Sequence, residues 1–336
     1  MSYSRFNTED IVLSSDTISV PIWSNGSENL VQEELTTSSI QTVGLSSNYY
    51  LDVYNTGSDG GPDKVQFAIA YADIDGSGST NYNSGVDGYS PSRTNYGQYR
   101  SLVLGDEESE FHFGETSETV SEYFWAISVD RARYRESLQA GALELILQDG
   151  PNFITLFDGG RYNEAVRYID SGRVYNIYDS GSYSSTGNNA VYGYYLPDIG
   201  TILLDCKLLE RYASASRFSS KVAGEDRPTD VAPNLKNSLN LCKAIHSFTL
   251  REQETITSNY VFVRAKNSEF NYSINPSSIT STGELRHSIM INQPETYITT
   301  VGLYNDANEL LAVAKLSRPL SKNFSKEALI RIKLDY

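Results

Sequence analysis

The chain has 336 residues, enough for two domains of ordinary size or one elaborate β domain with a well-buried core. Its 42 acidic and 27 basic residues give a net charge of -15, which argues against direct nucleic-acid binding, because phosphate neutralisation needs clusters of Lys and Arg. The hydrophobic fraction of 39% and the mean hydropathy of -0.38 exclude a disordered chain and indicate a soluble globular protein. The 25 Tyr residues are an unusually large number. Tyr suits strands and partly hydrated subunit contacts.

The N-terminal third predicts a β-hairpin followed by a long loop. The aromatic and β-branched runs 48–54 and 65–71 are separated by NTGSDGGPDK, a turn-rich stretch of the kind that joins hairpin strands. Residues 73–98 are rich in Gly, Ser, Asn and Tyr and almost free of aliphatic side chains, so we expect an exposed loop there. Its three tyrosines are candidate interface residues: Tyr82, Tyr89 and Tyr96.

The middle of the chain alternates acidic, strand-like and loop segments. Residues 101–122 carry seven acidic side chains and no basic one. The segments 123–130 and 142–149 are strand-like, and RARYRESLQAG between them predicts either one helical turn or a loop. The Gly/Ser/Tyr-rich stretch around Ser180 leads as a loop into another strand.

The best helix candidate spans 234–246, because apolar residues recur there at helical spacing. KLLERYAS, from Lys207, is a weaker candidate. The two cysteines, Cys206 and Cys242, show neither CxxC nor Cys/His ligand spacing, so we expect two buried free thiols rather than a disulfide or a zinc site.

After about residue 251 the pattern becomes fully β. NYVFVRAK, TYITTVGLY, ELLAVAKL and ALIRIKLD predict four strands. In the last strand Ile330, Ile332 and Leu334 face one way and Arg331 and Lys333 the other, as a half-buried strand requires.

The predicted fold class is mainly β, with antiparallel sheets or a sandwich, long Gly/Ser/Tyr-rich loops and one or two short helices. We expect two domains. Residues 1–250 form a β-rich domain with long loops, and residues 251–336 form a C-terminal β domain.

Residues 297–323 predict a tight hairpin with one apolar face. On the first strand Val301 and Leu303 alternate with small or polar residues, and NDAN supplies the turn. Leu311, Val313 and Leu316 lead back along the second strand. The hairpin is either an ordinary core element or a docking element.

A basic stretch at the C-terminus contrasts with the acidic remainder of the chain. Its candidate interface residues are Lys315, Arg318, Lys322 and Lys326. One hypothesis is that this stretch meets the acidic residues 101–122 of another copy, since complementary charges steer and register partners. The alternative is a solvated strand face.

The C-terminal third also carries a resemblance. YITTVGLYNDANELLAVAKLSRPLSKN, from Tyr297 to Asn323, resembles a hairpin of phage tail and baseplate-associated proteins, in which GLY and an acidic turn precede LLAVA. NYVFVRAKNSEFNYSINPS, from Asn259, and the final RIKLDY resemble virion structural proteins of large contractile-tailed phages, including those that infect cyanobacteria; GSGS and GYSPSRTNYGQY fit the same pattern. The resemblance implies a tail or baseplate subunit of a cyanophage-like myovirus.

No motif in the sequence carries catalytic or metal chemistry. DIDGSG at 73–78 resembles the start of a calcium loop, but Ser84 stands where a bidentate Glu is needed, so a turn is favoured. The histidines His112, His246 and His287 are not at metal-ligand spacing. A Ser-His-Asp site can assemble only in the fold, and no GxSxG, phosphate-loop or dinucleotide motif favours one. We therefore expect a non-enzymatic protein without cofactor or metal.

Three function classes fit the sequence. The leading one is a structural component of a phage virion, a tail or baseplate subunit that acts through protein–protein assembly contacts. The second is a receptor- or carbohydrate-binding tail adhesin, in which exposed tyrosines stack on sugar rings. The third is a tail polysaccharide lyase or glycosidase, which needs two carboxylates in a cleft, and no such pair is indicated.

The expected partners are other phage structural proteins, in multiple copies within a symmetric assembly. MSYSRFNTEDIVLSS has neither a basic start nor an apolar run, and no stretch approaches the roughly 18 apolar residues of a membrane span. We therefore expect assembly in the host cytoplasm and residence in the virion, with neither nucleic acid nor a membrane as partner.

Overall fold

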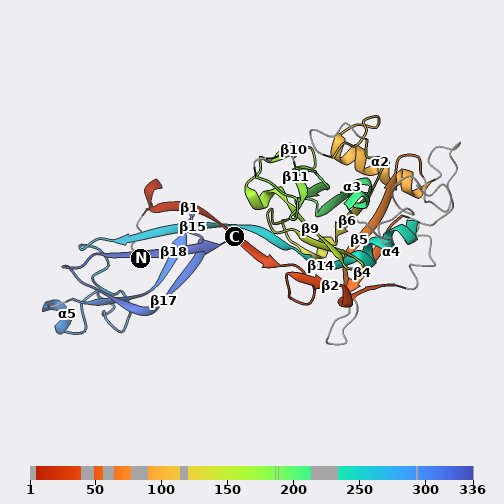
Figure 1. The fold of residues 1–336 in the computed structure, drawn as a ribbon. Coiled ribbons are helices and arrows are strands. Elements are labelled where there is room, and N and C mark those ends of the chain that lie inside the picture. Colours follow the sequence, from red (N-terminus) through yellow and green to blue (C-terminus); the bar gives the residue numbers. More distant parts are fainter. Residues whose placement is uncertain are drawn as a thin grey trace. The chain divides into compact units, whose positions relative to one another are not determined.

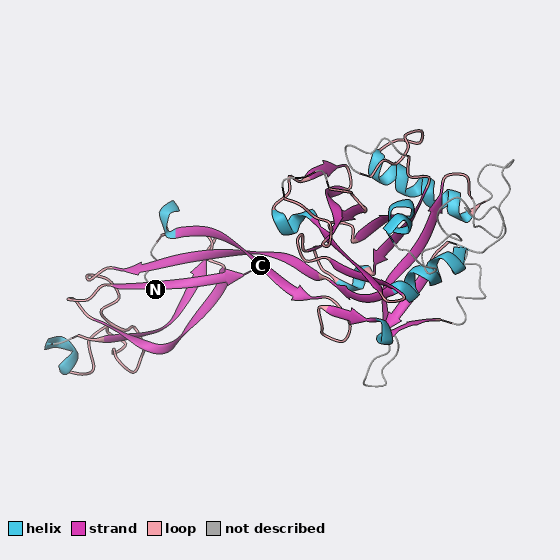
Figure 2. Cartoon of the chain, in the orientation of Figure 1, coloured by secondary structure: helices cyan, strands magenta, loops and turns pink. Residues whose placement is uncertain are grey.

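The computed structural model describes residues 5–38, 49–55, 64–76, 90–113, 120–185, 187, 189–212, 234–292 and 294–335. Strands dominate (Figure 2), so the prediction of a mainly β, antiparallel fold is confirmed. The described residues contain four α-helices, against one or two expected: α2 (Pro91–Leu104), α3 (Cys206–Tyr212), α4 (Asn234–Ala244) and α5 (Ile289–Asn292).

The chain divides into two compact units, which Figure 1 shows coloured along the sequence. The barrel unit is Ile18–Glu254, and the C-terminal unit combines Met1–Thr17 with Thr255–Tyr336. The sequence placed a boundary at residue 251, and the structure divides the chain four residues later. It also adds the N-terminal segment to the second unit, because strand β1 (Ile11–Pro21) pairs with β15 (Arg251–Ala265).

One large antiparallel sheet forms the frame of the barrel unit. Its strands are β2 (Asn29–Val31), β3 (Leu35–Thr37), β4 (Leu51–Asn55), β5 (Lys64–Asp73), β6 (Tyr123–Val129), β8 (Glu144–Asp149), β9 (Asn152–Asp158), β10 (Arg167–Ile169), β11 (Gly172–Asp179), β12 (Gly193–Leu196), β13 (Thr201–Asp205) and β14 (Ile245–Thr249).

The strand order nearly closes this sheet on itself. It runs β2-β14-β8-β9-β11-β12-β13-β6-β5-β4-β3, with β10 paired to β11. The two end strands follow each other in the chain and are joined only by the short helix η2 (Gln32–Glu34), so the ends of the sheet lie close together. The result is a nearly closed, barrel-like sheet.

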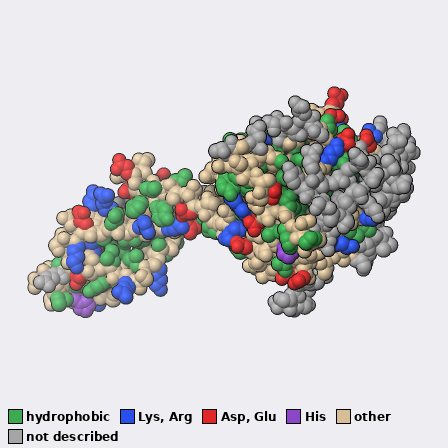
Figure 3. Space-filling model, in the orientation of Figure 1, with side chains coloured by type: hydrophobic (Ala, Val, Ile, Leu, Met, Phe, Trp, Pro, Cys, Tyr) green, Lys and Arg blue, Asp and Glu red, His purple; other side chains and the backbone are tan. Residues whose placement is uncertain are grey.

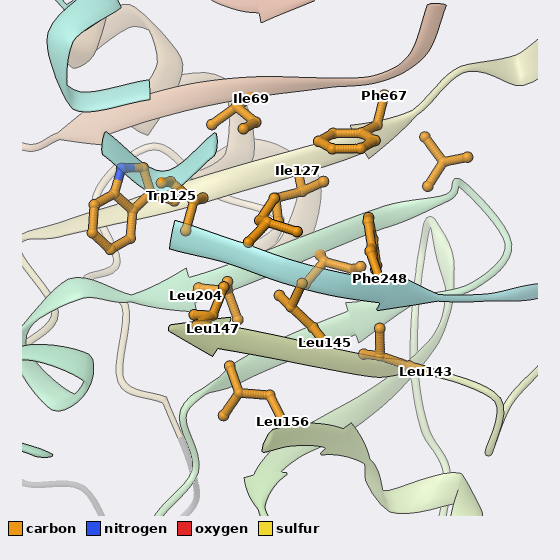
Figure 4. Close-up of a cluster of buried hydrophobic side chains, with 14 of the residues drawn as sticks. Phe67, Ile69, Trp125, Ile127, Leu143, Leu145, Leu147, Leu156, Leu204 and Phe248 are labelled. Atoms are coloured by element: carbon orange, nitrogen blue, oxygen red, sulfur yellow. The ribbon is translucent and has the colours of Figure 1, made fainter. Parts of the chain in front are cut away.

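Strand alternation fills the inside of the barrel with large side chains (Figure 4). Phe67 and Ile69 of β5 meet Trp125 and Ile127 of β6 and the apolar residues of the opposite strands. Helix α4 packs on the same side, and the Trp125 indole donates to the Asn237 carbonyl at 3.3 Å. The predictions of a hairpin over β4 and β5 and of a helix at α4 are confirmed.

Both cysteines contribute to this inner core. Cys206 and Cys242 are both buried and form no disulfide, as the sequence predicts. Burial raises the pKa of the Cys242 thiol to about 11.

Helix α2 covers part of the outer face of the sheet and corrects a prediction. The expected exposed loop over 73–98 is wrong where the structure describes it, because β5 runs to Asp73 and α2 begins at Pro91. Tyr96 is 1% exposed, and its ring lies 5.5 Å from that of Phe111. Its hydroxyl donates to the Ser121 carbonyl and accepts from the Phe111 amide, so Tyr96 is a core residue.

Short elements complete the barrel unit. The helices η4 (Arg131–Arg133) and η5 (Gly159–Tyr162) follow β6 and β9, and β7 (Ser137–Leu138) pairs with the first residues of β15. The expected helical turn or loop after residue 130 is thus the single turn η4.

The C-terminal unit combines a three-stranded path with a hairpin. After the short helix η1 (Thr8–Asp10), the order β1-β15-β18 includes β18 (Ala328–Asp335), while β16 (Thr296–Tyr304) and β17 (Leu310–Lys322) pair with each other. Ile330 and Ile332 of β18 are buried and Arg331 and Lys333 are exposed, which confirms the predicted alternation. The core is small: its buried cluster is Val261, Leu303, Ile330 and Ile332.

We expect Tyr96→Phe to destabilise the barrel unit by about 1–3 kcal/mol, because it leaves a buried amide and a buried carbonyl without their partner. Urea unfolding followed by Trp fluorescence measures this, since both tryptophans, Trp23 and Trp125, lie in this unit. Tyr168→Phe, at a side chain that is 72% exposed, is the control. Equal stability of the two variants would contradict the core role of Tyr96.

Candidate functional site

The hairpin β16–β17 has two apolar faces rather than the one predicted. Leu303 pairs with Ala312 and Val301 with Ala314, and these residues face the small core. Leu311 and Val313 alternate with the two alanines and therefore lie on the opposite side. The sequence assigned both to the core-facing side, and a bulge between Leu303 and Tyr304 is among the irregularities that its pattern did not reveal.

The outward face of the hairpin carries a cluster that we call the hairpin patch: Tyr304, Leu310, Leu311 and Val313. Gly302 pairs with Val313 and leaves room on this face, where the side chains of Tyr304 and Leu310 approach its backbone. Leu311 is 68% and Val313 58% exposed. Figure 3 shows hydrophobic side chains gathered over the strands of this unit. Contiguous apolar patches on a protein surface commonly mark interaction sites.

Strand β1 is a second unusual surface, because among the described strands it lies at the edge of its sheet and pairs with β15 alone. Ile11, Val12 and Leu13 are all exposed, although consecutive strand residues point to opposite faces. An apolar edge strand offers free backbone groups and side chains to another chain.

The predicted basic residues divide into exposed and buried groups. Lys315, Arg318 and Lys326 are exposed, and Lys315 follows Val313 on the outward face of β17. Lys322 is 0% exposed. Its ammonium donates to the Asn271 side chain at 2.8 Å and to the carbonyls of Asn267 and Asn323, so its prediction as an interface residue is wrong.

The other predicted site residues lie in the barrel unit. Tyr96 is in the core, as described above, while Tyr82 and Tyr89 lie outside the described residues. Of the acidic stretch 101–122, residues 106–110 are exposed after α2. Hydrogen bonds from Ser109 lower the pKa of Asp106, which favours its charged form.

Charge is distributed unequally between the two units. Residues 1–17 and 255–336 carry ten basic and ten acidic side chains, so the C-terminal unit is neutral. The barrel unit has the remaining 17 basic and 32 acidic residues and hence the whole net charge. The apolar surfaces thus belong to the part of the chain with no net repulsion between copies.

Two searches concern the described residues alone. They contain no group of three or more His, Cys, Asp or Glu that could hold a metal ion. Asp73, in the calcium-like segment, accepts hydrogen bonds from Tyr71 and from the Asp75 amide and forms a turn. Within the same part of the chain no helix has the length and apolar character needed to cross a membrane.

Backbone amides surround the buried carboxyl group of Asp158. Asp158 is 0% exposed, and its carboxylate accepts from the amides of Gly141, Leu143 and Gly160. These bonds tie the end of β9 to the turn before β8. Burial raises the pKa of Asp158 to about 6, although the three amides oppose the shift.

Comparisons of the chain with protein families, curated proteins and solved structures find no match.

We expect Lys322→Met to destabilise the C-terminal unit by on the order of 2–4 kcal/mol, because it removes the donor shared by three acceptors. Hydrogen exchange of peptides around Asn271 and Lys322 should accelerate, while the Trp unfolding transition of the barrel unit stays unchanged. Lys326→Met, at an exposed residue, is the matched control. Unchanged hydrogen exchange in Lys322→Met would contradict a stabilising role of the buried Lys322 hydrogen bonds.

Asp158 also predicts a pH dependence. The folded carboxyl binds its proton near pH 6 and the unfolded one near 3.8, so the native state holds more protons between these values and wild-type stability rises as pH falls. Relative to Asp158→Asn, the wild type should gain up to about 3 kcal/mol between pH 7.5 and about pH 4. Urea unfolding of both proteins at several pH values measures the difference, and a constant difference would mean that folding does not raise the pKa of Asp158.

Proposed function

We propose that the chain is a structural subunit of a bacteriophage particle, in the tail or baseplate, and that it acts through protein–protein contacts of its C-terminal unit. The observation that carries the proposal is the hairpin patch, with Leu311 and Val313 more than half exposed beside a core of four buried apolar side chains. A partner that covers the patch would add the apolar burial that the unit lacks by itself.

The edge strand β1 supports the same proposal. Its exposed residues Ile11, Val12 and Leu13 would be covered, and its free backbone groups paired, if a neighbouring subunit added a strand to the sheet. Such contacts recur in obligate assemblies, whose interfaces are larger and more apolar than those of transient complexes.

The assignment to a phage particle rests on the resemblance of residues 255–336 to virion proteins of contractile-tailed phages. The proposed partners are other phage structural proteins, and the proposed location is the virion after assembly in the host cytoplasm. The acidic barrel unit disfavours DNA as the partner, because its 32 acidic residues outnumber the 17 basic ones. The proposed role is non-enzymatic.

Mass spectrometry of purified particles of the phage that encodes this chain tests the proposal. We expect the chain at a fixed stoichiometry relative to the other tail proteins. Its absence from washed particles would overturn the proposal.

A double variant tests the proposed contact. Leu311→Ser combined with Val313→Ser, introduced into the phage genome, should lower incorporation into particles about tenfold or more, because it removes the apolar contact. Both residues are exposed in the free chain, so the double variant should lose little folding stability. Phe153→Ser, at a ring 55% exposed in the barrel unit, is the matched control and should be incorporated normally. Normal incorporation of the double variant would exclude the hairpin patch as the contact.

A further inference from the structure

A groove of about 450 Å³ lies on the barrel unit between helix α2 and the outer face of the sheet, a volume within the usual range of small-ligand sites. None of the described residues that line it belongs to the hairpin patch or to β1. A ligand in the groove would therefore contact other residues than those of the proposed assembly contacts.

The floor of the groove is made of small side chains. On the outer faces of β5 and β6, Ala68 pairs with Ser128 and Ala70 with Ala126. The inward neighbours of these residues are large, so the alternation of each strand places bulk inside the barrel and leaves a shallow hollow outside. The next pair, Ala72 with Phe124, belongs to the aromatic cluster under α2.

Tyrosines and amides form the walls. Tyr49 and Tyr50, just before β4, stand on one side and are 44% and 42% exposed. Gln98 and Tyr99 of α2 stand on the other, with Gln98 exposed. The rings of Tyr49 and Tyr50 are exposed, whereas Tyr99 is partly buried and packs against the aromatic cluster that contains Tyr96.

Buried hydrogen bonds hold this wall in place. Asn95 is 6% exposed, and its amide nitrogen donates to the carbonyls of Tyr49 and Tyr71 at 2.7 and 2.9 Å. It thereby ties α2 to the chain that enters β4. The Tyr99 hydroxyl lies 3.2 Å from the Ser128 hydroxyl and joins the wall to the floor. The two sides of the groove are thus preorganised, which lowers the entropic cost of binding.

The chemistry of the lining selects the class of ligand. The described lining residues are tyrosines, amides, alanines and a serine, with no charged side chain among them. No Lys or Arg is among these described residues, so the lining supplies no positive charge that would favour an anionic ligand. A sugar ring presents an apolar face of C–H groups and a rim of hydroxyls, which match aromatic faces and amide or hydroxyl groups respectively.

We propose that the groove between α2 and strands β4–β6 binds a neutral saccharide, stacked against Tyr50 or Tyr49 and hydrogen-bonded by Gln98 and the Tyr99–Ser128 pair. A purely apolar ligand is disfavoured, because both walls of the groove present polar groups. For a particle subunit, this site would supply contact with a surface glycan in addition to assembly.

Titration of the full chain with maltotriose, cellotriose and N,N′,N″-triacetylchitotriose tests the site, by calorimetry and by saturation-transfer NMR from the aromatic protons. We expect at least one trisaccharide to bind with a dissociation constant of about 1 mM or tighter. Tyr50→Ala should weaken it about fivefold or more, and Gln98→Ala about threefold. Tyr168→Ala, at an exposed tyrosine of β10, should bind as the wild type does.

Lack of binding by all three sugars at about 10 mM, a concentration above the expected dissociation constant, would overturn the proposal. So would binding that survives both Tyr50→Ala and Gln98→Ala, or a preference for the anionic 3′-sialyllactose over the neutral sugars. Urea unfolding followed by Trp fluorescence shows whether each variant is folded. If Tyr50→Ala does not fold, the binding measured for Gln98→Ala, a change at an exposed helix position, decides between the outcomes. Incorporation into particles is an independent readout, so the saccharide site and the assembly role can fail separately.

Discussion

The strict alternation of side chains along β5 and β6 is the constraint on which the rest of the barrel unit depends. Phe67, Ile69, Trp125 and Ile127 all point inward and pack against the opposite strands, so a slip by one residue would reverse every one of them. The same alternation places the alanines outside, where α2 can approach the sheet. Core and groove are thus two consequences of one register.

The C-terminal unit uses the alternation differently, because large apolar residues occupy both faces of its hairpin. Leu303 belongs to a small core, whose buried cluster has four members among the described residues, while Leu311 and Val313 face outward. When one apolar face of a sheet is not covered, its side chains stay in contact with water, which is unfavourable. Burial of that face against a neighbouring subunit removes the unfavourable contact. The neutrality of this unit also lets copies or partners approach without repulsion.

The sequence pattern predicted most strands and α4, because the hydrophobic period and the turn residues that mark them lie within short stretches of the chain. Helix α2 was missed although Pro91 at its first position and Gly105 at its end, with a φ of 78°, are helix signals. The composition of Tyr, Ser and Gly around it favoured a loop. Long-range contacts gave no local signal. Two of the three acceptors of Lys322, Asn267 and Asn271, lie more than fifty residues away, and β1 pairs with a strand that begins at residue 251.

A cryo-EM structure of the intact phage tail and baseplate tests the proposed role most directly. If the C-terminal unit docks as proposed, the chain occupies a symmetric position with Leu311 and Val313 buried against a neighbouring subunit. The edge of β1 would be covered in the same map. A chain present in the particle with the hairpin patch and β1 still facing solvent would contradict docking through this unit.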